Sequence, residues 1–490
     1  MALGACDGNE DGADPLAAQK PDWTSCPTST SPSARPTNDA RWECSEVEVP
    51  LDWSKPDGKS MKLALIRAKA TGPGRRIGSL VFNFGGPGTP GVTTLPLAAK
   101  TYDKLRSRYD LVSFDPRGTG ISDPVRCLDD TALDDASETD STPDNAAEQT
   151  ARLELAQTMA RACEKNSGPL LAHMNTHSTA RDLDLLRQVL GDNKLHYFGI
   201  SYGTELGAVY AHLFPNNVGR AVFDAPIDPT QTPEQSALGQ ARGFQLALDN
   251  FLKDCTSKRS SCPVGDDPKK GERKIAALLA QLEHEPLPTQ DGRPLTQTRA
   301  LNGIIQTLYA QDYWTYLTQG LEEAEQQGTG NMLLALSDAL TGRDARGHYN
   351  NTQVANTATT CADTTQRYTA KDVRKKLRTF RNTSSIFGAY YAWTQLLQCT
   401  DWPIEGKATG PDVSAKGSAP IVLVGTTGDP ATPYEGTRHM AEQLGAGVGI
   451  QVTSKGQGHG AYGTSTCVTN TVNAYLLHHV LPKNGTTCTP

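Results

Sequence analysis

The sequence predicts an α/β protein with a mostly parallel central sheet and a large helical insertion, and three observations lead to this prediction. Apolar runs of strand length recur along the chain, several of them without polar alternation, as in strands that are buried on both faces of a sheet. Helical patterns lie between these runs, as parallel strands require. One long stretch is almost wholly helical and lies between two of the strand candidates.

The predicted strands extend from the first part of the chain almost to its end. Their runs of Val, Ile, Leu and Phe fit a sheet that helices cover on both faces. They lie at residues 61–68, 79–84, 111–114, 195–200, 221–223, 421–425 and 450–453.

The length of the chain suggests a core domain that carries an insertion. A chain of 490 residues is too long for one minimal domain. Residues 1–40 are rich in Asp, Pro, Ser and Thr and predict a solvated tether. We place the first part of the core at residues 41–227, a helical lid domain at 228–416 and the second part of the core at 417–490. A helical block inserted between two strands is typical of a lid over one edge of the sheet.

Two stretches depart from the alternation of strands and helices. In the inserted block, helical patterns lie around residues 234–253, 269–283, 300–319 and 386–398. Residues 129–150 carry eight acidic residues and no basic one, and a helical pattern follows to about residue 165. We interpret the acidic stretch as a solvated surface loop.

Charge and hydropathy exclude two classes of partner. The formal net charge is -7, so the chain lacks the basic footprint that nucleic acid binding requires. No stretch reaches the roughly 18 uninterrupted apolar residues that span a bilayer. The mean hydropathy is -0.48. We therefore expect neither a nucleic acid partner nor a membrane-spanning segment.

The eleven cysteines predict disulfides in an oxidising compartment. None forms a CxxC pair and no histidine cluster lies near them, so we predict no metal site, and no motif indicates a cofactor. Leu3-Gly4-Ala5-Cys6 resembles the lipobox at which bacterial lipoproteins are acylated, which predicts a lipid anchor at Cys6; a chance tetrapeptide is the alternative. Ten cysteines remain, enough for five disulfides. The sequence does not determine their connectivity, and the simplest hypothesis joins neighbours: Cys26 with Cys44, Cys127 with Cys163, Cys255 with Cys262, Cys361 with Cys399, and Cys467 with Cys488.

A G-x-S-x-G motif identifies Ser201 as the candidate nucleophile. Gly199-Ile200-Ser201-Tyr202-Gly203 follows the predicted strand at 195–200, and a helical pattern begins at once. This context, a strand followed by a sharp turn and a helix, is the one in which the motif presents a reactive serine in an α/β-hydrolase fold. The glycines are needed because flanking β-carbons would collide in the strained turn. The alternative is a tight turn with a buried hydroxyl.

A serine nucleophile needs a general base that an acid orients. Asp429 follows the predicted strand at 421–425, and His459 follows the strand at 450–453 within Gly458-His459-Gly460. Their order after Ser201 is that of α/β-hydrolases, and both positions fall at the carboxyl edge of the sheet. An Asp-Pro turn and an ordinary glycine loop are the alternatives for Asp429 and His459.

Two backbone N–H groups are needed to stabilise the oxyanion. The residue after the nucleophile, Tyr202, supplies one. The second is expected from Gly85-Gly86-Pro87-Gly88, after the strand at 79–84. Pro87 has no N–H to donate, so we assign this role to Gly86; a Gly-Pro turn without a catalytic part is the alternative.

Together these motifs resemble a known family. The set comprises G-G-P-G at 85–88, S-F-D-P-R-G-T-G-I-S at 113–122, G-I-S-Y-G-T at 199–204, G-D-P-A-T-P at 428–433 and G-H-G at 458–460. From about residue 42 to the C-terminus the chain resembles the tripeptidyl aminopeptidases of actinobacteria, within the wider proline iminopeptidase group. The resemblance implies removal of short peptides from free amino termini by secreted or lipid-anchored enzymes. Phe84 departs from the histidine that many members of the wider group carry there.

An aminopeptidase must also bind the ammonium group of its substrate, which usually requires a carboxylate in the lid. Asp363 is our candidate, because it lies beside Cys361, whose disulfide would fix its surroundings; a solvated acid is the alternative. The sequence leaves three hypotheses open: an aminopeptidase that releases di- or tripeptides, a carboxylesterase that uses the same triad on uncharged esters, and a non-catalytic binding protein of this fold.

Overall fold

The computed structural model describes residues 16–26, 41–258, 262–407 and 412–489. Cys6 and most of the predicted tether lie outside these residues. Residues 16–26, which the composition assigns to the tether, are attached to the core instead. Thr24 and Ser25 pair with the first long strand, and the side chain of Gln19 bonds the main chain of Glu48 at 2.8 Å.

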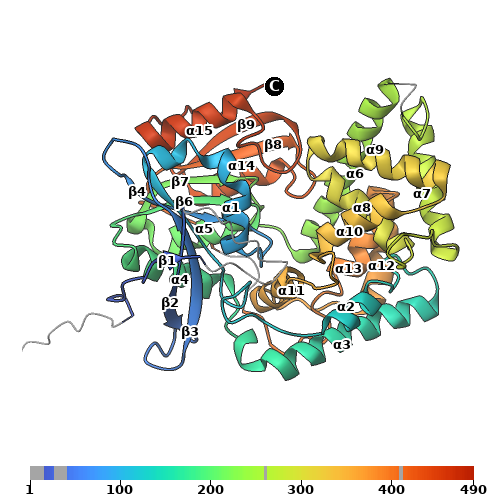
Figure 1. Ribbon diagram of the computed structural model, residues 1–490, viewed down its shortest axis with the longest axis horizontal. Coiled ribbons are helices and arrows are strands. Elements are labelled where there is room, and N and C mark those ends of the chain that lie inside the picture. The colour runs from blue at the N-terminus through green and yellow to red at the C-terminus, as the bar shows by residue number, and fades with distance from the viewer. Residues whose placement is uncertain (1–15, 27–40, 259–261, 408–411, 490) are drawn as a thin grey trace, which may run out of the picture.

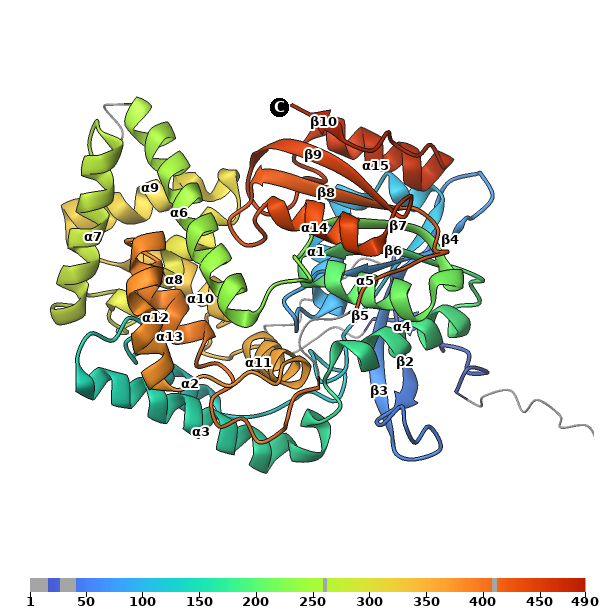
Figure 2. The same ribbon diagram turned by 180° about the vertical axis from the view of Figure 1, so that it is seen from behind.

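A ten-stranded, mostly parallel sheet forms one lobe of the molecule (Figures 1 and 2). Its strand order is β1-β2-β3-β5-β4-β6-β7-β8-β9-β10. The pairs β1·β2, β2·β3 and β3·β5 are antiparallel, and the other pairs are parallel. The strands are β1 (Thr24–Ser25), β2 (Trp42–Pro50), β3 (Ser60–Ala68), β4 (Gly78–Asn83), β5 (Tyr109–Phe114), β6 (Leu195–Ile200), β7 (Val218–Asp224), β8 (Ile421–Gly428), β9 (Gly449–Gln457) and β10 (Thr486–Cys488).

All seven predicted strands are present, and the predicted α/β-hydrolase fold class is confirmed. β2 was missed. It lies near the edge of the sheet and alternates exposed and buried side chains, with Glu46 and Glu48 facing solvent and Val47 and Val49 buried. This alternation is the period of a half-buried strand, and it was the available signal.

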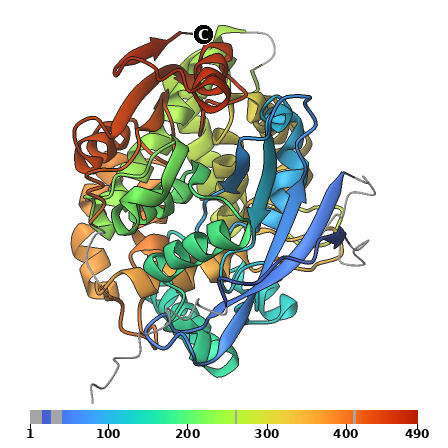
Figure 3. The ribbon, with the colours of Figure 1, turned by 90° about the vertical axis from the view of Figure 1, so that its left-hand side faces the viewer.

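Helices cover both faces of the sheet, and Figure 3 shows this lobe from its side. One face packs on α4 (Thr176–Val189), α5 (Tyr202–Leu213) and α14 (Glu435–Leu444). The other packs on α1 (Gly91–Tyr102) and α15 (Thr466–His478). The central strands β4 and β5 are buried along their whole length, as the continuous apolar runs predicted.

The helices between β7 and β8 form the second lobe around an apolar core of their own. They are α6 (Pro233–Ser257), α7 (Pro268–His284), α8 (Gln297–Leu308), α9 (Trp314–Glu322), α10 (Asn331–Thr341), α11 (Thr352–Asp363), α12 (Ala370–Thr383) and α13 (Gly388–Gln395). The single helix predicted at 300–319 is wrong. It breaks after Leu308, and a 3-10 turn at Gln311–Tyr313 precedes α9.

The acidic stretch at 129–150 is not the solvated loop that we predicted. It contains α2 (Asp130–Ala136) and the start of α3 (Ala146–Leu171), and both lie along the helical lobe in Figures 1 and 2. The Asp134 carboxylate pairs with Arg343 at 2.7 Å, and the main chain of Ser141 donates to the hydroxyl of Thr298. Part of the stretch therefore binds basic and polar groups of the inserted block, whereas Asp129, Asp135 and Asp144 remain exposed.

All five predicted disulfides are present. They are compatible with export, because disulfides persist in oxidising compartments. In the part of the chain that the structure describes, no helix has the length and apolar content to cross a membrane.

Removing the Cys361–Cys399 bridge is expected to lower the melting temperature more than removing Cys255–Cys262. The first bridge closes a sequence separation of 38 residues and the second one of 7, so the loop-entropy difference is about 1.5 kcal/mol. Calorimetry of the two double Cys→Ser variants measures this. Equal melting temperatures would contradict the expectation, and five or more free thiols in non-reducing mass spectrometry of the parent would contradict the pairing itself.

Candidate active site

Ser201 occupies a strained turn between β6 and α5. Its φ is 57° and its ψ is -125°, a combination that costs free energy for a residue other than glycine. The neighbouring glycines make the turn possible. A β-carbon on Gly199 would lie 2.4 Å from the carbonyl oxygen of Gly203, and one on Gly203 would lie 2.5 Å from that of Asn83. The geometry is therefore that of a nucleophile elbow.

Asp429 and His459 meet at the carboxyl edge of the sheet. Asp429 follows β8, His459 follows β9, and the Nδ1 atom of the imidazole lies 2.9 and 3.0 Å from the two carboxylate oxygens. The Asp429 carboxylate is buried and accepts further hydrogen bonds from the main chain of Ala431 and Thr432 and from the Thr432 hydroxyl. Because an ionised carboxylate only accepts, Nδ1 donates and Nε2 is left as the basic nitrogen.

The surroundings of His459 favour its protonated form. Burial on its own lowers the pKa of the imidazole, but the charge and hydrogen bond of Asp429, with a further contribution from Asp224, raise the pKa above its ordinary value. An acid that favours the imidazolium is what a general base needs when it accepts the proton of a serine.

The nucleophile turn and the loop that carries His459 both bond to Asp224. The N–H of Ser201 donates to the carbonyl oxygen of Asp224 at 3.0 Å, and the carboxylate of Asp224 accepts from the N–H of Ala461, in the histidine loop, at 3.0 Å. Among the described residues, no hydrogen bond joins the Ser201 hydroxyl to the His459 ring. Such bonds are often long without substrate and tighten in the complex. Sequence reasoning missed Asp224, although its place at the end of a predicted strand was a signal.

The predicted oxyanion residues Gly86 and Tyr202 lie next in the chain to Gly85 and Ser201, which approach each other closely. A β-carbon on Gly85 would lie 2.5 Å from the carbonyl oxygen of Ile200 and 2.9 Å from the β-carbon of Ser201, so the glycine loop presses directly on the elbow. In the part of the chain described here, no acceptor binds the N–H of Gly86. The N–H of Tyr202 is the first of α5, and the first N–H groups of a helix have no partner within it. Both groups therefore remain the candidate donors to a developing oxyanion.

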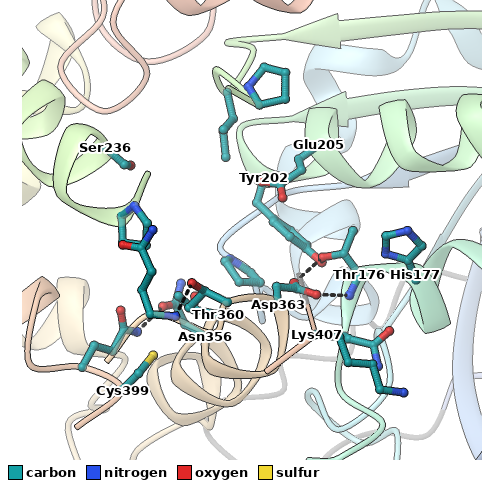
Figure 4. A pocket seen from close by; sticks show the side chains of 18 of the residues that line it. Thr176, His177, Tyr202, Glu205, Ser236, Asn356, Thr360, Asp363, Cys399 and Lys407 are labelled. Atoms are coloured by element: carbon teal, nitrogen blue, oxygen red, sulfur yellow. Dashed lines mark hydrogen bonds between the residues drawn. The ribbon is translucent and has the colours of Figure 1, made fainter. Parts of the chain in front are cut away.

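A cavity of about 810 Å³ lies between the two lobes and reaches the oxyanion residues (Figure 4). Gly86, Pro87 and Tyr202 line it on the side of the core, and residues of α6, α11 and the segment after α13 line it on the side of the helical block. Ser201 and His459 are not among its lining residues, so the cavity adjoins the elbow on the side of Tyr202.

Asp363 and Glu205 are two of the four carboxylates that line this cavity, together with Asp52 and Asp228. Asp363, at the end of α11, accepts hydrogen bonds from the main chain and the hydroxyl of Thr176 at 2.9 and 2.6 Å, and the same hydroxyl bonds the Tyr202 hydroxyl at 2.6 Å. Glu205 projects from α5, one turn after Ser201, toward the same space in Figure 4. Asp363 thus lies where the sequence predicted an acid. Glu205 was missed, although a lone acid in the apolar helix after the nucleophile was a signal.

Neither carboxylate has a basic partner in the described residues. Burial raises the pKa of Asp363 to about 6 and that of Glu205 to about 8, and the charge of Asp363 adds to the second shift. Both side chains are partly exposed to the cavity, so a cation that bound beside them would stabilise their ionised forms. We take this side of the cavity, which Arg181 and Lys407 also line, as the candidate subsite for a positively charged group.

The helical block contacts the histidine loop directly. The break after α8 leaves the carbonyl oxygen of Tyr309 free to accept the main-chain N–H of His459 at 2.7 Å, and the Tyr309 ring lies edge-on to the imidazole with centroids 5.6 Å apart. On the same side, the Asn250 amide of α6 bonds Gln457 at 2.9 Å. The inserted block therefore contacts both the candidate base, His459, and the end of the strand that leads to it.

One carboxylate cluster has the spacing of metal ligands. Asp140, Glu148 and Glu283 each offer an oxygen, and these atoms lie within 4.8 Å of one another. None of the three lines the cavity beside Ser201. The cluster belongs to the contact between the acidic stretch and the helical block.

Comparison with known proteins shows matches along nearly the whole chain. Residues 384–488 match the family model described as "TAP-like protein". The chain is 36% identical over 490 residues to serine protease Hip1 of Mycobacterium tuberculosis, which covers 97% of this chain and 92% of that protein.

Two further relatives bear different names. The chain is 36% identical over 495 residues to carboxylesterase B of Mycobacterium tuberculosis, covering 97% of this chain and 91% of the relative. It is 30% identical over 457 residues to the tripeptidyl aminopeptidase of Streptomyces lividans, covering 91% of this chain and 84% of the relative.

Proposed function

The chain belongs to the tripeptidyl aminopeptidase-like α/β-hydrolases and is a serine hydrolase of the peptidase type, and from this premise we propose that it releases short peptides, tripeptides by the resemblance, from free amino termini. The proposal rests mainly on the carboxylate pair of Glu205 and Asp363. An ammonium group is the cation that a peptide substrate brings to such a pair.

The proposed chemistry proceeds through an acyl-enzyme on Ser201. The hydroxyl proton passes to Nε2 of His459 as the oxygen attacks the scissile carbonyl, while Asp429 holds the imidazole by its Nδ1. The N–H groups of Gly86 and Tyr202 stabilise the oxyanion. His459 then returns the proton to the leaving amine, and a water molecule hydrolyses the ester in the same way.

The position of the cavity would restrict cleavage to the amino-terminal end of a peptide. Its lining joins the oxyanion residues at one end to the carboxylate pair, so a substrate with its carbonyl at Ser201 would direct its amino terminus toward Glu205 and Asp363. We propose that residues 228–416 act as a lid, because Tyr309 of this block binds the main chain of His459. A roof over the elbow limits the length of chain that passes it.

The disulfides bear on where the protein works. The five disulfides are compatible with an exported protein. We propose that the protein works outside the cytoplasm or at the cell surface, where Cys6 would carry a lipid if the lipobox-like sequence is used. Mass spectrometry of the protein from the membrane fraction is expected to detect a diacylglycerol group on Cys6. An unmodified Cys6 in that protein would contradict the lipid anchor.

A carboxylesterase is the second candidate, because carboxylesterase B covers nearly the whole chain at 36% identity. Chromogenic mono-, di- and tripeptides with free and acetylated amino termini separate the two. We expect turnover of the free peptides, highest for tripeptides, and loss of turnover on acetylation. Equal turnover of free and acetylated substrates would favour the esterase, and cleavage within a long amino-blocked peptide would contradict the exopeptidase.

Glu205→Gln and Asp363→Asn are each expected to lower kcat/KM for free-amino peptides by about 30-fold or more, because a truncated buried charge pair costs about 2 kcal/mol or more. Small acetate esters, which carry no ammonium group, should be cleaved as by the parent. Glu234→Gln is the matched control, since Glu234 lies in the same block as Asp363 but already pairs with Lys376. Equal losses on both substrates would indicate misfolding, and no loss on either would contradict the proposed subsite.

Thermal stability distinguishes a binding acid from a structural one. The pKa of Glu205 is raised in the fold from its ordinary value of 4.5 to about 8. Its contribution to stability is therefore complete below about pH 4.5 and is lost as the pH rises through about 8. Glu205→Gln should thus melt a few degrees above the parent at pH 9 while losing activity, and a lower melting temperature there would contradict this.

A further inference from the structure

Asp224 is a buried carboxylate at the carboxyl end of β7. It is 3% exposed, and no lysine or arginine of the described residues pairs with it. Its oxygens accept only main-chain N–H groups, from Ala461 at 3.0 and 3.1 Å and from Tyr462 at 2.8 Å. Burial raises its pKa to about 6, and among charged side chains His459 is the one that opposes this rise. Keeping a carboxylate ionised at a buried position costs free energy.

The contacts of Asp224 join the two halves of the site. Its carbonyl oxygen accepts the N–H of Ser201, and its carboxylate binds the two residues that lie second and third after His459. The nucleophile and the base come from segments on opposite sides of the inserted block in the sequence. A single residue on the strand between them therefore fixes the distance from the elbow to the histidine loop.

A carboxylate is the group that suits this place. Both oxygens face N–H donors, so an asparagine would turn its amide NH₂ toward one of them and lose a bond. The negative charge also acts on His459, whose pKa it raises together with Asp429. The groups that face these two residues are Asp429 from the loop after β8, Tyr309 from the helical block, Tyr102 from α1 and Tyr462.

We propose that Asp224 is a positioning residue that holds the loop of His459 against the nucleophile elbow and, through its charge, stabilises the imidazolium formed when Ser201 is deprotonated. The inference rests on the proposed roles of Ser201 and His459. In the reaction the proton moves from the Ser201 oxygen to Nε2 of His459 and then to the leaving group, while Asp224 stays ionised and gains no proton. It acts through the histidine and touches no substrate atom.

The test is the rate at which a fluorophosphonate labels Ser201 as a function of pH, in the full chain. Labelling requires neutral His459, so its acidic limb reports the pKa of the imidazole. For Asp224→Asn we expect this limb to move to lower pH by about half a unit or more. The plateau rate should fall about 10- to 100-fold, as small misplacements of catalytic groups do, and KM for peptide substrates should stay unchanged.

Asp115→Asn is the matched control. Asp115 is 1% exposed and directly follows the strand β5. It accepts the main-chain N–H groups of Val92 and Ile121 at 2.9 Å, and burial raises its pKa to about 6. The Asp115→Asn variant measures the structural cost of losing a similar buried carboxylate. The acidic limb of its labelling rate should lie at the same pH as that of the parent. An unmoved limb in Asp224→Asn, with a rate equal to that of the control, would overturn the proposal.

Two further outcomes are decisive. If Asp224→Asn does not fold, Asp224→Glu keeps the charge but moves it by one methylene group. Labelling that is about tenfold slower, with an acidic limb at the same pH as in the parent, supports the positioning role. A labelling rate equal to that of the parent overturns it. The probe needs no free amino terminus, so the result is independent of the peptide specificity proposed above. Absence of label on Ser201 in the parent would instead overturn the triad assignment, and the role of Asp224 with it.

Discussion

Replacing Ser201 by alanine is expected to lower peptide hydrolysis by about four or more orders of magnitude, because the loss of a triad serine leaves only the contribution of binding and of the oxyanion hole. The fold should survive. The strain of the turn lies in the main chain of Ser201 and in the approaches around Gly199 and Gly203, none of which involves the hydroxyl group.

Activity and fluorophosphonate labelling of Ser201→Ala measure this loss, and circular dichroism checks the fold. Ser178→Ala serves as a control for labelling, since Ser178 lines the same cavity. Label that persists on another serine of the Ser201→Ala variant would show that the nucleophile is misassigned.

Asp429→Asn is expected to lower kcat by about four orders of magnitude while the protein stays folded. The hydrogen bonds from Ala431, Thr432 and the Thr432 hydroxyl can hold an asparagine side chain in nearly the same place. Its amide group would then donate to Nδ1 of His459, which forces the proton onto Nε2 and leaves no base for Ser201. The loss therefore comes from the tautomer of the histidine.

The kcat of Asp429→Asn with a free-amino tripeptide tests this expectation. Asp110→Asn is the control, since Asp110 is also buried but binds Arg76 away from the cavity. If the Asp429→Asn enzyme kept a tenth or more of the parental kcat, Asp429 would not be the orienting acid, and Asp224 would be the next carboxylate to test in that role.

The sheet and the loops at its carboxyl edge could be predicted because their signals are local. A strand buried on both faces is a continuous apolar run, and β6 was predicted with the bounds that the structure shows. Asp429 and His459 could be placed because each follows such a run within a loop rich in Gly or Pro. The same locality explains the disulfides, which all join neighbours in the sequence.

What could not be predicted depends on contacts between distant segments. Residues 309–313 contain neither Gly nor Pro, so nothing local ends the helix there; the contact of Tyr309 with His459 does. Glu205 and Asp224 look like ordinary acids in the sequence, since burial against another lobe or loop is what makes them unusual. The acidic stretch was misjudged because its partners Thr298 and Arg343 lie far along the chain.

The disulfide pattern has a consequence for how the protein matures. Within the described residues, each bridge spans between 7 and 38 positions, and none crosses from the inserted block to the sheet lobe. If the protein is exported as proposed, four of the pairs can oxidise as their own short segments emerge, before the C-terminal strands of the core exist, and Cys467–Cys488 follows once β10 (Thr486–Cys488) has emerged. Cysteines that pair in the order of their emergence need little reshuffling by thiol–disulfide exchange, which is otherwise a slow step of seconds to hours. Docking of the two lobes then depends on noncovalent contacts and not on a disulfide.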